Sequence, residues 1–141
     1  MSDLNQQYML LGGLSNQPKK LYESFIDVAK QHFFFRPMVP DEADILISGN
    51  VRVISGAITL DPQGQHLACF IGGMVAMASR IFDRPDELAL GRKLTDGCIW
   101  AYRAMPSGIM PEMFQATPCG KRKDCPWNAK VGWSLIGKDM C

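Results

Sequence analysis

Hydrophobic residues recur at helical spacing in the first third of the chain and predict two helices there. The first occupies residues 3–11 and ends at Gly12 and Gly13, because glycine readily takes the left-handed conformation found at helix ends. The second opens at Asn16 and Pro18 and ends before Arg36-Pro37, since proline disfavours helical geometry in the residue that precedes it. The expected buried face of this second helix has steps of three and four residues and comprises Leu21, Phe25, Val28, Ala29 and His32.

The period of the pattern then changes from that of a helix to that of a strand. Residues 45–47 and 51–58 are rich in β-branched side chains, and the glycine-containing segment 48–50 between them has the composition of a turn. The pattern predicts a β-hairpin that turns at residues 48–50. Two strands are too few for an independent sheet, so we expect this hairpin to pack on helices.

Two longer helices are predicted next, joined by the short link Asp83-Arg84 as an antiparallel hairpin. The apolar stripe of the first consists of Leu67, Phe70, Ile71, Met74, Val75, Ala78 and Phe82. The second begins at Pro85, and its stripe consists of Leu90, Leu94, Gly97, Cys98, Ala101 and Met105. From Pro106 onward the chain is rich in Pro and Gly, and we expect loop. The predicted fold class is all-α with a small inserted β-hairpin, in an α-toroid or another helical array.

The composition narrows the function classes. A net charge of +1 gives no basis for binding nucleic acid or an anionic membrane. The basic cluster at residues 121–123 is short and is followed by Asp124, so we expect a solvated loop there rather than a polyanion site. The apolar stretch 67–78 is shorter than the roughly 18 residues of a membrane-spanning helix, and residues 1–11 carry no signal peptide pattern.

Five cysteines, at positions 69, 98, 119, 125 and 141, favour an oxidising compartment over a zinc site. Cys69 lies 13 residues before Phe82, and Cys98 lies 13 residues after Pro85. At about 1.5 Å per residue, both cysteines lie about 20 Å from the turn, at the open end of the helical hairpin. We expect a Cys69–Cys98 disulfide; the alternative is two buried free thiols. Cys141 would remain unpaired.

The same open end should bring His66 and Glu112 together. His66 precedes the first long helix, and the tight segment 107–111 would hold Glu112 against the end of the second. A histidine and a carboxylate fixed beside a disulfide suggest the wall of a pocket. Alternatively, His66 caps a helix and Glu112 is a solvated loop residue. One carboxylate does not make a glycosidase, which needs two.

Several motifs in order carry a family resemblance. The segments Gln65–Phe70 and Gly72–Met74 resemble the His-Leu-x-Cys-Phe signature of class I α-mannosidases, glycoside hydrolase family 47, in its fungal form. Gly97 and Cys98 with Tyr102, and then Gly108–Glu112, resemble the Gly-Cys and Gly-x-x-Pro-Glu segments of the family. Further similar segments are Tyr8–Gly12, Phe35–Met38 and Asp61-Pro62, so the similarity runs from Gln6 to Trp127.

This resemblance implies an (αα)7 barrel, of which residues 1–141 supply about two of seven helical hairpins as part of one catalytic domain. It implies an inverting, calcium-dependent enzyme that removes α-1,2-linked mannose from high-mannose N-glycans of glycoproteins. Such enzymes work in the endoplasmic reticulum or Golgi, or are secreted. His66 would belong to the mannose-binding wall and Glu112 to the acidic residues of the pocket. Cys69–Cys98 would be the structural bridge, and Cys119–Cys125 a second, local one.

The chain also departs from the family pattern. The resemblance places the catalytic acidic residues in an Asp-Ser-x-Tyr-Glu-Tyr segment before Gln6 and an Arg-Pro-Glu segment after Trp133. The calcium site, with its threonine, belongs near the family's C-terminus. We therefore expect a truncated chain without metal ligands that is inactive alone. The alternatives are a mannose-binding lectin module, whose known relatives typically lack the cysteine pair, and an unrelated helical interaction domain.

Overall fold

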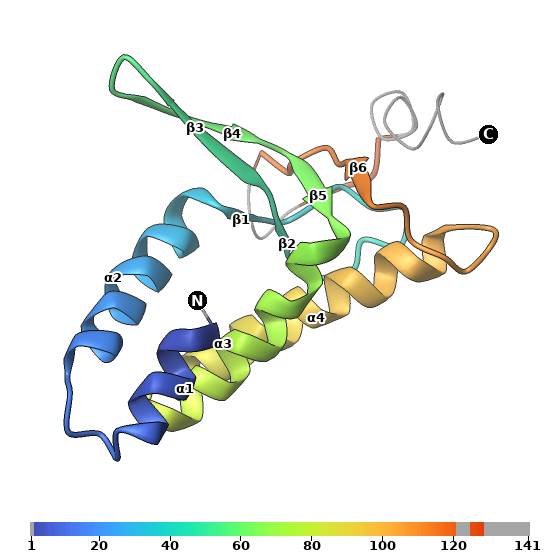
Figure 1. Cartoon of the computed structure of the whole chain (residues 1–141). Helices are drawn as coiled ribbons and strands as arrows, with labels where there is room; N and C mark the ends of the chain where they lie inside the picture. Colours follow the sequence, from blue (N-terminus) through green and yellow to red (C-terminus); the bar gives the residue numbers. More distant parts are fainter. Residues whose placement is uncertain (1, 121–124, 129–141) are drawn as a thin grey trace.

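The structure is a computed structural model that describes residues 2–120 and 125–128 (Figure 1). The helices are α1 (Ser2–Leu10), α2 (Gln17–His32), α3 (Phe70–Ile81) and α4 (Asp86–Ala104), with a 3-10 turn η1 (His66–Cys69) before α3. The strands are β1 (Phe34–Phe35), β2 (Ile47–Ser48), β3 (Asn50–Ile54), β4 (Ala57–Asp61), β5 (Gln63–Gln65) and β6 (Met113–Gln115). The chain is thus helix-rich, but it has three small two-stranded sheets, whereas the predicted all-α fold contained one inserted β-hairpin.

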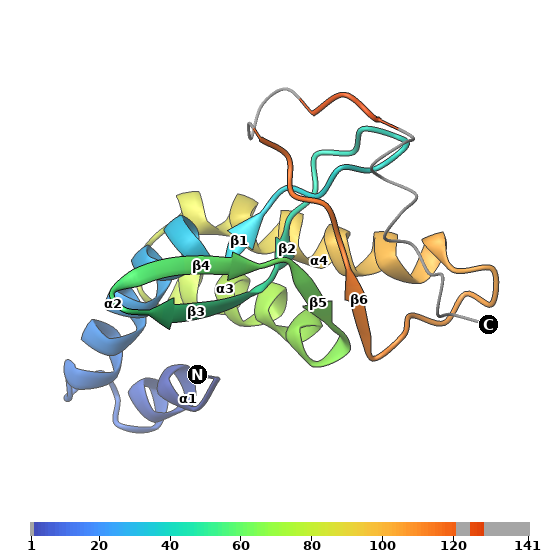
Figure 2. The same cartoon turned by 90° about the horizontal axis from the view of Figure 1, so that it is seen from above.

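The predicted antiparallel helical hairpin is confirmed as α3 and α4, which lie along each other in both views (Figures 1 and 2). Small residues let the two backbones approach closely. A methyl group on Gly72 would lie 2.8 Å from the Thr95 nitrogen and 2.9 Å from the Gly91 carbonyl oxygen. A methyl group on Gly91 would lie 2.8 Å from the Gly72 carbonyl oxygen. Neither glycine can carry a side chain without separating the helices.

Two adjacent glycines of α3 provide a matched test of this packing. Gly72→Ala should lower the free energy of unfolding by roughly 1–3 kcal/mol, because the added methyl group meets backbone atoms of α4. Gly73→Ala should be neutral or should stabilise by up to about 1 kcal/mol, because its methyl group meets no atom within 4 Å and alanine favours the helix. Urea denaturation followed by circular dichroism compares the two variants. Equal stability of both would contradict the close packing.

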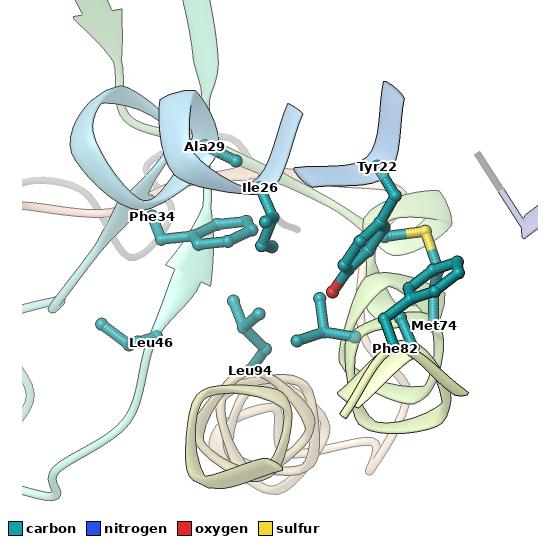
Figure 3. Close-up of a cluster of buried hydrophobic side chains, with 10 residues drawn as sticks. Tyr22, Ile26, Ala29, Phe34, Leu46, Met74, Phe82 and Leu94 are labelled. Carbon is teal, nitrogen blue, oxygen red and sulfur yellow. The ribbon is translucent and has the colours of Figure 1, made fainter. Parts of the chain in front are cut away.

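Helix α2 crosses the hairpin and forms the core with it (Figure 3). Its buried residues are Pro18, Tyr22, Ile26 and Ala29, and Figure 3 shows the last three facing α3 and α4. The predicted buried face was therefore wrong for Leu21 and Val28, each of which is 50% exposed. The helix is rotated because Tyr22 also bonds to a buried carboxylate of α4, a contact that apolar spacing does not reveal.

A β-hairpin forms in this region, but the predicted pairing of residues 45–47 with 51–58 was wrong, because Ile47 pairs with Phe35 of β1 instead. Strands β3 and β4 pair from Asn50↔Asp61 to Ile54↔Ala57, and the turn is Ser55-Gly56. Both turn residues have positive φ, 51° and 83°, as two-residue hairpin turns require. Gly49, in segment 48–50, lies against the backbone of β4 instead of forming a turn. A methyl group at this position would lie 2.8 Å from the Asp61 carbonyl oxygen, so a side chain does not fit there.

The other two sheets join segments that are distant in sequence. Strand β1 pairs with β2, and β5 pairs with β6. The loop predicted from Pro106 onward therefore contains a strand, β6, which the Pro- and Gly-rich composition hid. Figure 2 shows β5 and β6 side by side near the C-terminal half of α4. This sheet positions the residues described next.

Candidate functional site

The β5–β6 pair brings His66 and Glu112 together, as the sequence predicted. His66 directly follows β5, Glu112 directly precedes β6, and the last paired residues are Gln65 and Met113. The His66 backbone N–H donates to the Glu112 carbonyl oxygen at 2.8 Å. The two side chains thus start from one rung of backbone.

A tyrosine that we had not assigned to the site completes this arrangement. His66 Nε2 lies 2.6 Å from the Tyr102 hydroxyl oxygen, and the two rings meet edge to face at 5.9 Å between centroids. Tyr102 follows Cys98 by four residues, so both lie on the same face of α4. That spacing was the signal in the sequence. The hydrogen bond fixes one ring nitrogen of His66 and leaves Nδ1 for another partner.

A disulfide clamps this end of the helical hairpin. Cys69 and Cys98 are bonded, with Cα atoms 5.6 Å apart, which confirms the predicted pairing over two free thiols. The bridge ties η1, which begins at His66, to α4. Closing this 29-residue separation contributes about 3.5 kcal/mol on the chain-entropy model. The buried Met110 contacts the bridge, with its Sδ 3.8 Å from Cys69 Sγ.

The Glu112 side chain is exposed and has no hydrogen bond or ion pair within residues 2–120 and 125–128. Its carboxylate can therefore accept hydrogen bonds from a ligand. Together with the imidazole of His66, it offers donors and acceptors suited to a polar, uncharged molecule rich in hydroxyl groups. Catalysis of glycoside hydrolysis needs a second carboxylate, and for inversion the two carboxyl groups lie roughly 6.5–9.5 Å apart.

Within the described residues, no group of three or more His, Cys, Asp and Glu side chains could hold a metal ion. None of the described helices has both the length and the apolar character needed to cross a bilayer.

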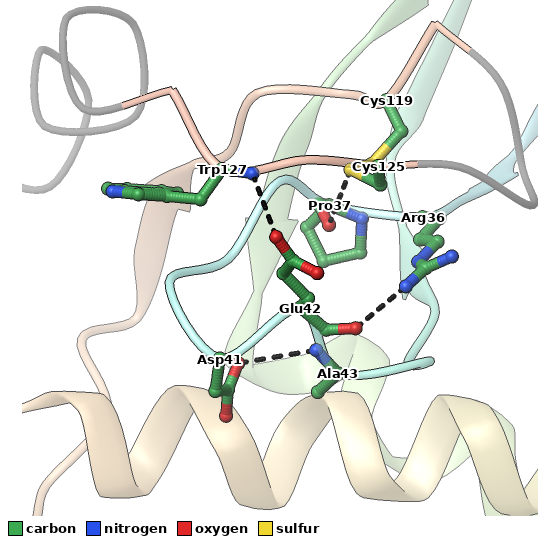
Figure 4. Close-up of a disulfide and its surroundings, with 8 residues drawn as sticks. All are labelled: Arg36, Pro37, Asp41, Glu42, Ala43, Cys119, Cys125 and Trp127. Carbon is green, nitrogen blue, oxygen red and sulfur yellow. Dashed lines mark hydrogen bonds between the residues drawn. A yellow bond between two sulfur atoms is a disulfide. The ribbon is translucent and has the colours of Figure 1, made fainter.

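A second disulfide joins Cys119 and Cys125, with Cα atoms 5.5 Å apart, as the resemblance implied (Figure 4). The Cys119 N–H donates to the Arg36 carbonyl oxygen at 2.9 Å, and Cys125 Sγ lies 3.8 Å from the Pro37 carbonyl oxygen. The bridge thus packs on the segment after β1. The basic cluster at 121–123 and Cys141 lie outside the described residues.

A buried ionic cluster lies at the opposite end of the hairpin, and the sequence pattern did not predict it. Glu87 is fully buried and accepts a hydrogen bond from the Tyr22 hydroxyl at 2.8 Å. Its other oxygen lies 2.7 Å from both Lys30 Nζ and Arg84 Nε. Arg84 Nη2 also donates to Asp27 at 3.0 Å. This cluster fastens α2 to the start of α4.

The cluster shifts the pKa of two of its members. Burial, and then the hydrogen bond to Glu87, raise the pKa of Tyr22 well above its usual value. Partial burial would lower the pKa of Arg84, but the charges of Glu87 and Asp27 outweigh it and raise that pKa. Both side chains therefore keep their protons, and the cluster serves structure rather than proton transfer.

Comparisons with known proteins agree on one family. Residues 3–138 match the model of glycosyl hydrolase family 47. The chain is 43% identical over 56 residues to the probable mannosyl-oligosaccharide alpha-1,2-mannosidase 1B of Neosartorya fischeri. This aligned segment covers 40% of the present chain and 11% of the relative. For the mannosyl-oligosaccharide alpha-1,2-mannosidase 1B of Emericella nidulans the identity is 39% over 56 residues, 40% of this chain and 11% of the relative. For a probable enzyme of that name in Aspergillus niger it is 33% over 84 residues, 60% of this chain and 15% of the relative. The aligned segments span a small part of each relative's length.

Proposed function

Because the chain belongs to glycosyl hydrolase family 47, we propose that it is part of a mannosyl-oligosaccharide α-1,2-mannosidase and supplies one wall of its mannose pocket. Its partners would then be high-mannose N-glycans on glycoproteins, in the secretory pathway or outside the cell. The two disulfides support such an oxidising compartment.

The observation that carries the proposal is that His66, held by Tyr102, lies next to Glu112 beside the Cys69–Cys98 bridge. The backbone bond between residues 66 and 112 places the starts of these two side chains next to each other. Tyr102 orients the imidazole. Neighbouring hydroxyl groups of a mannose residue could then donate to Glu112 and exchange hydrogen bonds with His66 Nδ1. Pre-set geometry of this kind reduces the entropy lost on binding.

Turnover requires more than this trio. In the proposed inverting reaction one carboxyl group protonates the leaving oxygen and another activates a water molecule. Next to His66 lies one carboxylate, that of Glu112. We assign Glu112 the role of binding hydroxyl groups of the sugar. Calcium dependence belongs to the proposed whole enzyme, and no step of the binding described here passes through the metal. We therefore expect the 141-residue chain to bind mannose and not to hydrolyse it.

A binding and turnover experiment tests this proposal. Calorimetric titration of the purified chain should show saturable binding of α-1,2-mannobiose and weaker binding of cellobiose, a β-linked glucose disaccharide. Mannose release from the same disaccharide, with and without calcium, should equal that of a protein-free blank. Equal affinity for both disaccharides would contradict the mannose pocket, whereas mannose release above the blank would overturn the inactivity of the chain.

A further inference from the structure

A cleft on another face of α4 is not part of the site around His66. It has a volume of about 630 Å³, within the range of roughly 300–1,000 Å³ typical of ligand sites, and lies between residues 40–45 and the C-terminal half of α4. We propose that this cleft is a second carbohydrate site, which holds a mannose residue of the glycan other than the one in the His66 pocket. The choice of mannose as the sugar rests on the proposed function, whereas the existence of the cleft and its lining residues does not.

One helical stripe forms the floor of the cleft. Asp96, Ile99, Trp100 and Arg103 follow steps of three, one and three residues, which places them on one side of α4. At about 100° per residue, the middle of this stripe is roughly a third of a turn from Tyr102. One helix can therefore serve both sites, with Tyr102 beside His66 and the stripe in the cleft.

The floor combines an aromatic face with hydrogen-bonding groups. Trp100 is half-buried and Ile99 is exposed, so both offer apolar surface to a ligand. The guanidinium group of Arg103 is exposed and has no partner within the described residues. A pyranose ring matches this lining, because its C–H face packs on an aromatic ring while neighbouring hydroxyl groups accept from a guanidinium fork.

The charges around the cleft favour a neutral ligand over a cationic one. Asp44 is paired with Lys93, at 2.5 Å between Oδ2 and Nζ, and Asp96 Oδ2 lies 3.7 Å from Arg92 Nε. The carboxylate of Asp41 accepts the Ala43 N–H at 3.4 Å. With two of these three acidic groups balanced by cations and Arg103 added, little negative charge remains to attract a basic peptide.

The opposite wall is held in place before any ligand binds. Figure 4 shows residues 41–43 beside α4 and below the Cys119–Cys125 bridge. The Arg36 guanidinium donates to the Glu42 carbonyl oxygen at 2.7 Å, and the Glu42 carboxylate accepts the Trp127 N–H at 3.5 Å. Glu42 itself has a φ of 52°, a conformation that these contacts must maintain. The second disulfide thus acts as a brace for a preformed cleft.

Nuclear magnetic resonance of the full chain tests the second site. On titration with α-1,2-mannobiose, the indole N–H signal of Trp100, assigned with Trp100→Phe, and the amide of Ala43 should shift and saturate. Arg103→Met should weaken binding at these signals about tenfold or more, as expected for loss of a charge-assisted hydrogen bond. The control Arg80→Met, an exposed arginine on α3, should leave the affinity unchanged.

The signals of the two sites separate the possible outcomes. Shifts at Trp100 that Arg103→Met weakens support the cleft, whether or not the amides of His66 and Tyr102 respond. Shifts at His66 and Tyr102 alone overturn the cleft proposal and leave the proposed function standing. Absence of any shift overturns both. Saturation of Trp100 by an oligolysine peptide but not by the disaccharide, with strong dependence on salt, also overturns the carbohydrate assignment.

Discussion

Replacing Glu87 with glutamine should lower the free energy of unfolding by roughly 2–4 kcal/mol. The fully buried carboxylate neutralises Lys30 and Arg84 and accepts from Tyr22, and glutamine keeps the shape while it removes the charge. Both cationic side chains are partly exposed, so water offsets part of the loss. Since a small domain has a total stability of about 5–15 kcal/mol, this change is large. Urea denaturation at neutral pH, with the disulfides intact, measures it.

The neighbouring Asp86 supplies the matched control. Its side chain is 78% exposed and lies 4.0 Å from Lys30 Nζ, so Asp86→Asn should cost at most about 1 kcal/mol. If the two variants are equally stable, Glu87 is not the residue that fastens α2 to α4.

The same cluster gives the stability a dependence on alkaline pH. Because burial and Glu87 raise the pKa of Tyr22 in the folded chain, the folded state holds the tyrosine proton at pH values where the unfolded state releases it. The unfolded state then binds fewer protons, so stability is full below the usual tyrosine pKa of about 10 and falls as the pH rises above it. Urea denaturation at a series of pH values should show that the free energy of unfolding decreases above about pH 10. An unchanged free energy over that range would contradict this role of Tyr22.

The elements that the sequence predicted well depend on local spacing. The α3–α4 hairpin follows from two apolar stripes and a short link, and that hairpin places Cys69 and Cys98 at one end. His66 and Glu112 meet for the same reason, because each flanks that end. Helical periodicity fixes these positions without knowledge of the rest of the fold.

The elements that the sequence did not predict depend on contacts between distant segments. The face of α2 is set by the bond between Tyr22 and Glu87, which are 65 residues apart. Strand β6 is three residues long and exists through its pairing with β5. Gly49 suggested a turn because glycine is common in turns. In the structure its lack of a side chain instead allows close packing against the Asp61 backbone. Such roles become visible once the partner is known.

The central claim, that Glu112 and His66 form a wall of a mannose pocket, is tested most directly by Glu112→Gln. Glutamine keeps the backbone bond to His66 but replaces a charged acceptor with a neutral amide. The dissociation constant for α-1,2-mannobiose, read from the amide signals of His66 and Tyr102 rather than from the cleft on α4, should rise about tenfold or more. Asp86→Asn, at the opposite end of the hairpin, is the control and should bind like the unmodified chain. Unchanged affinity of the Glu112→Gln chain would contradict the assignment of this pocket.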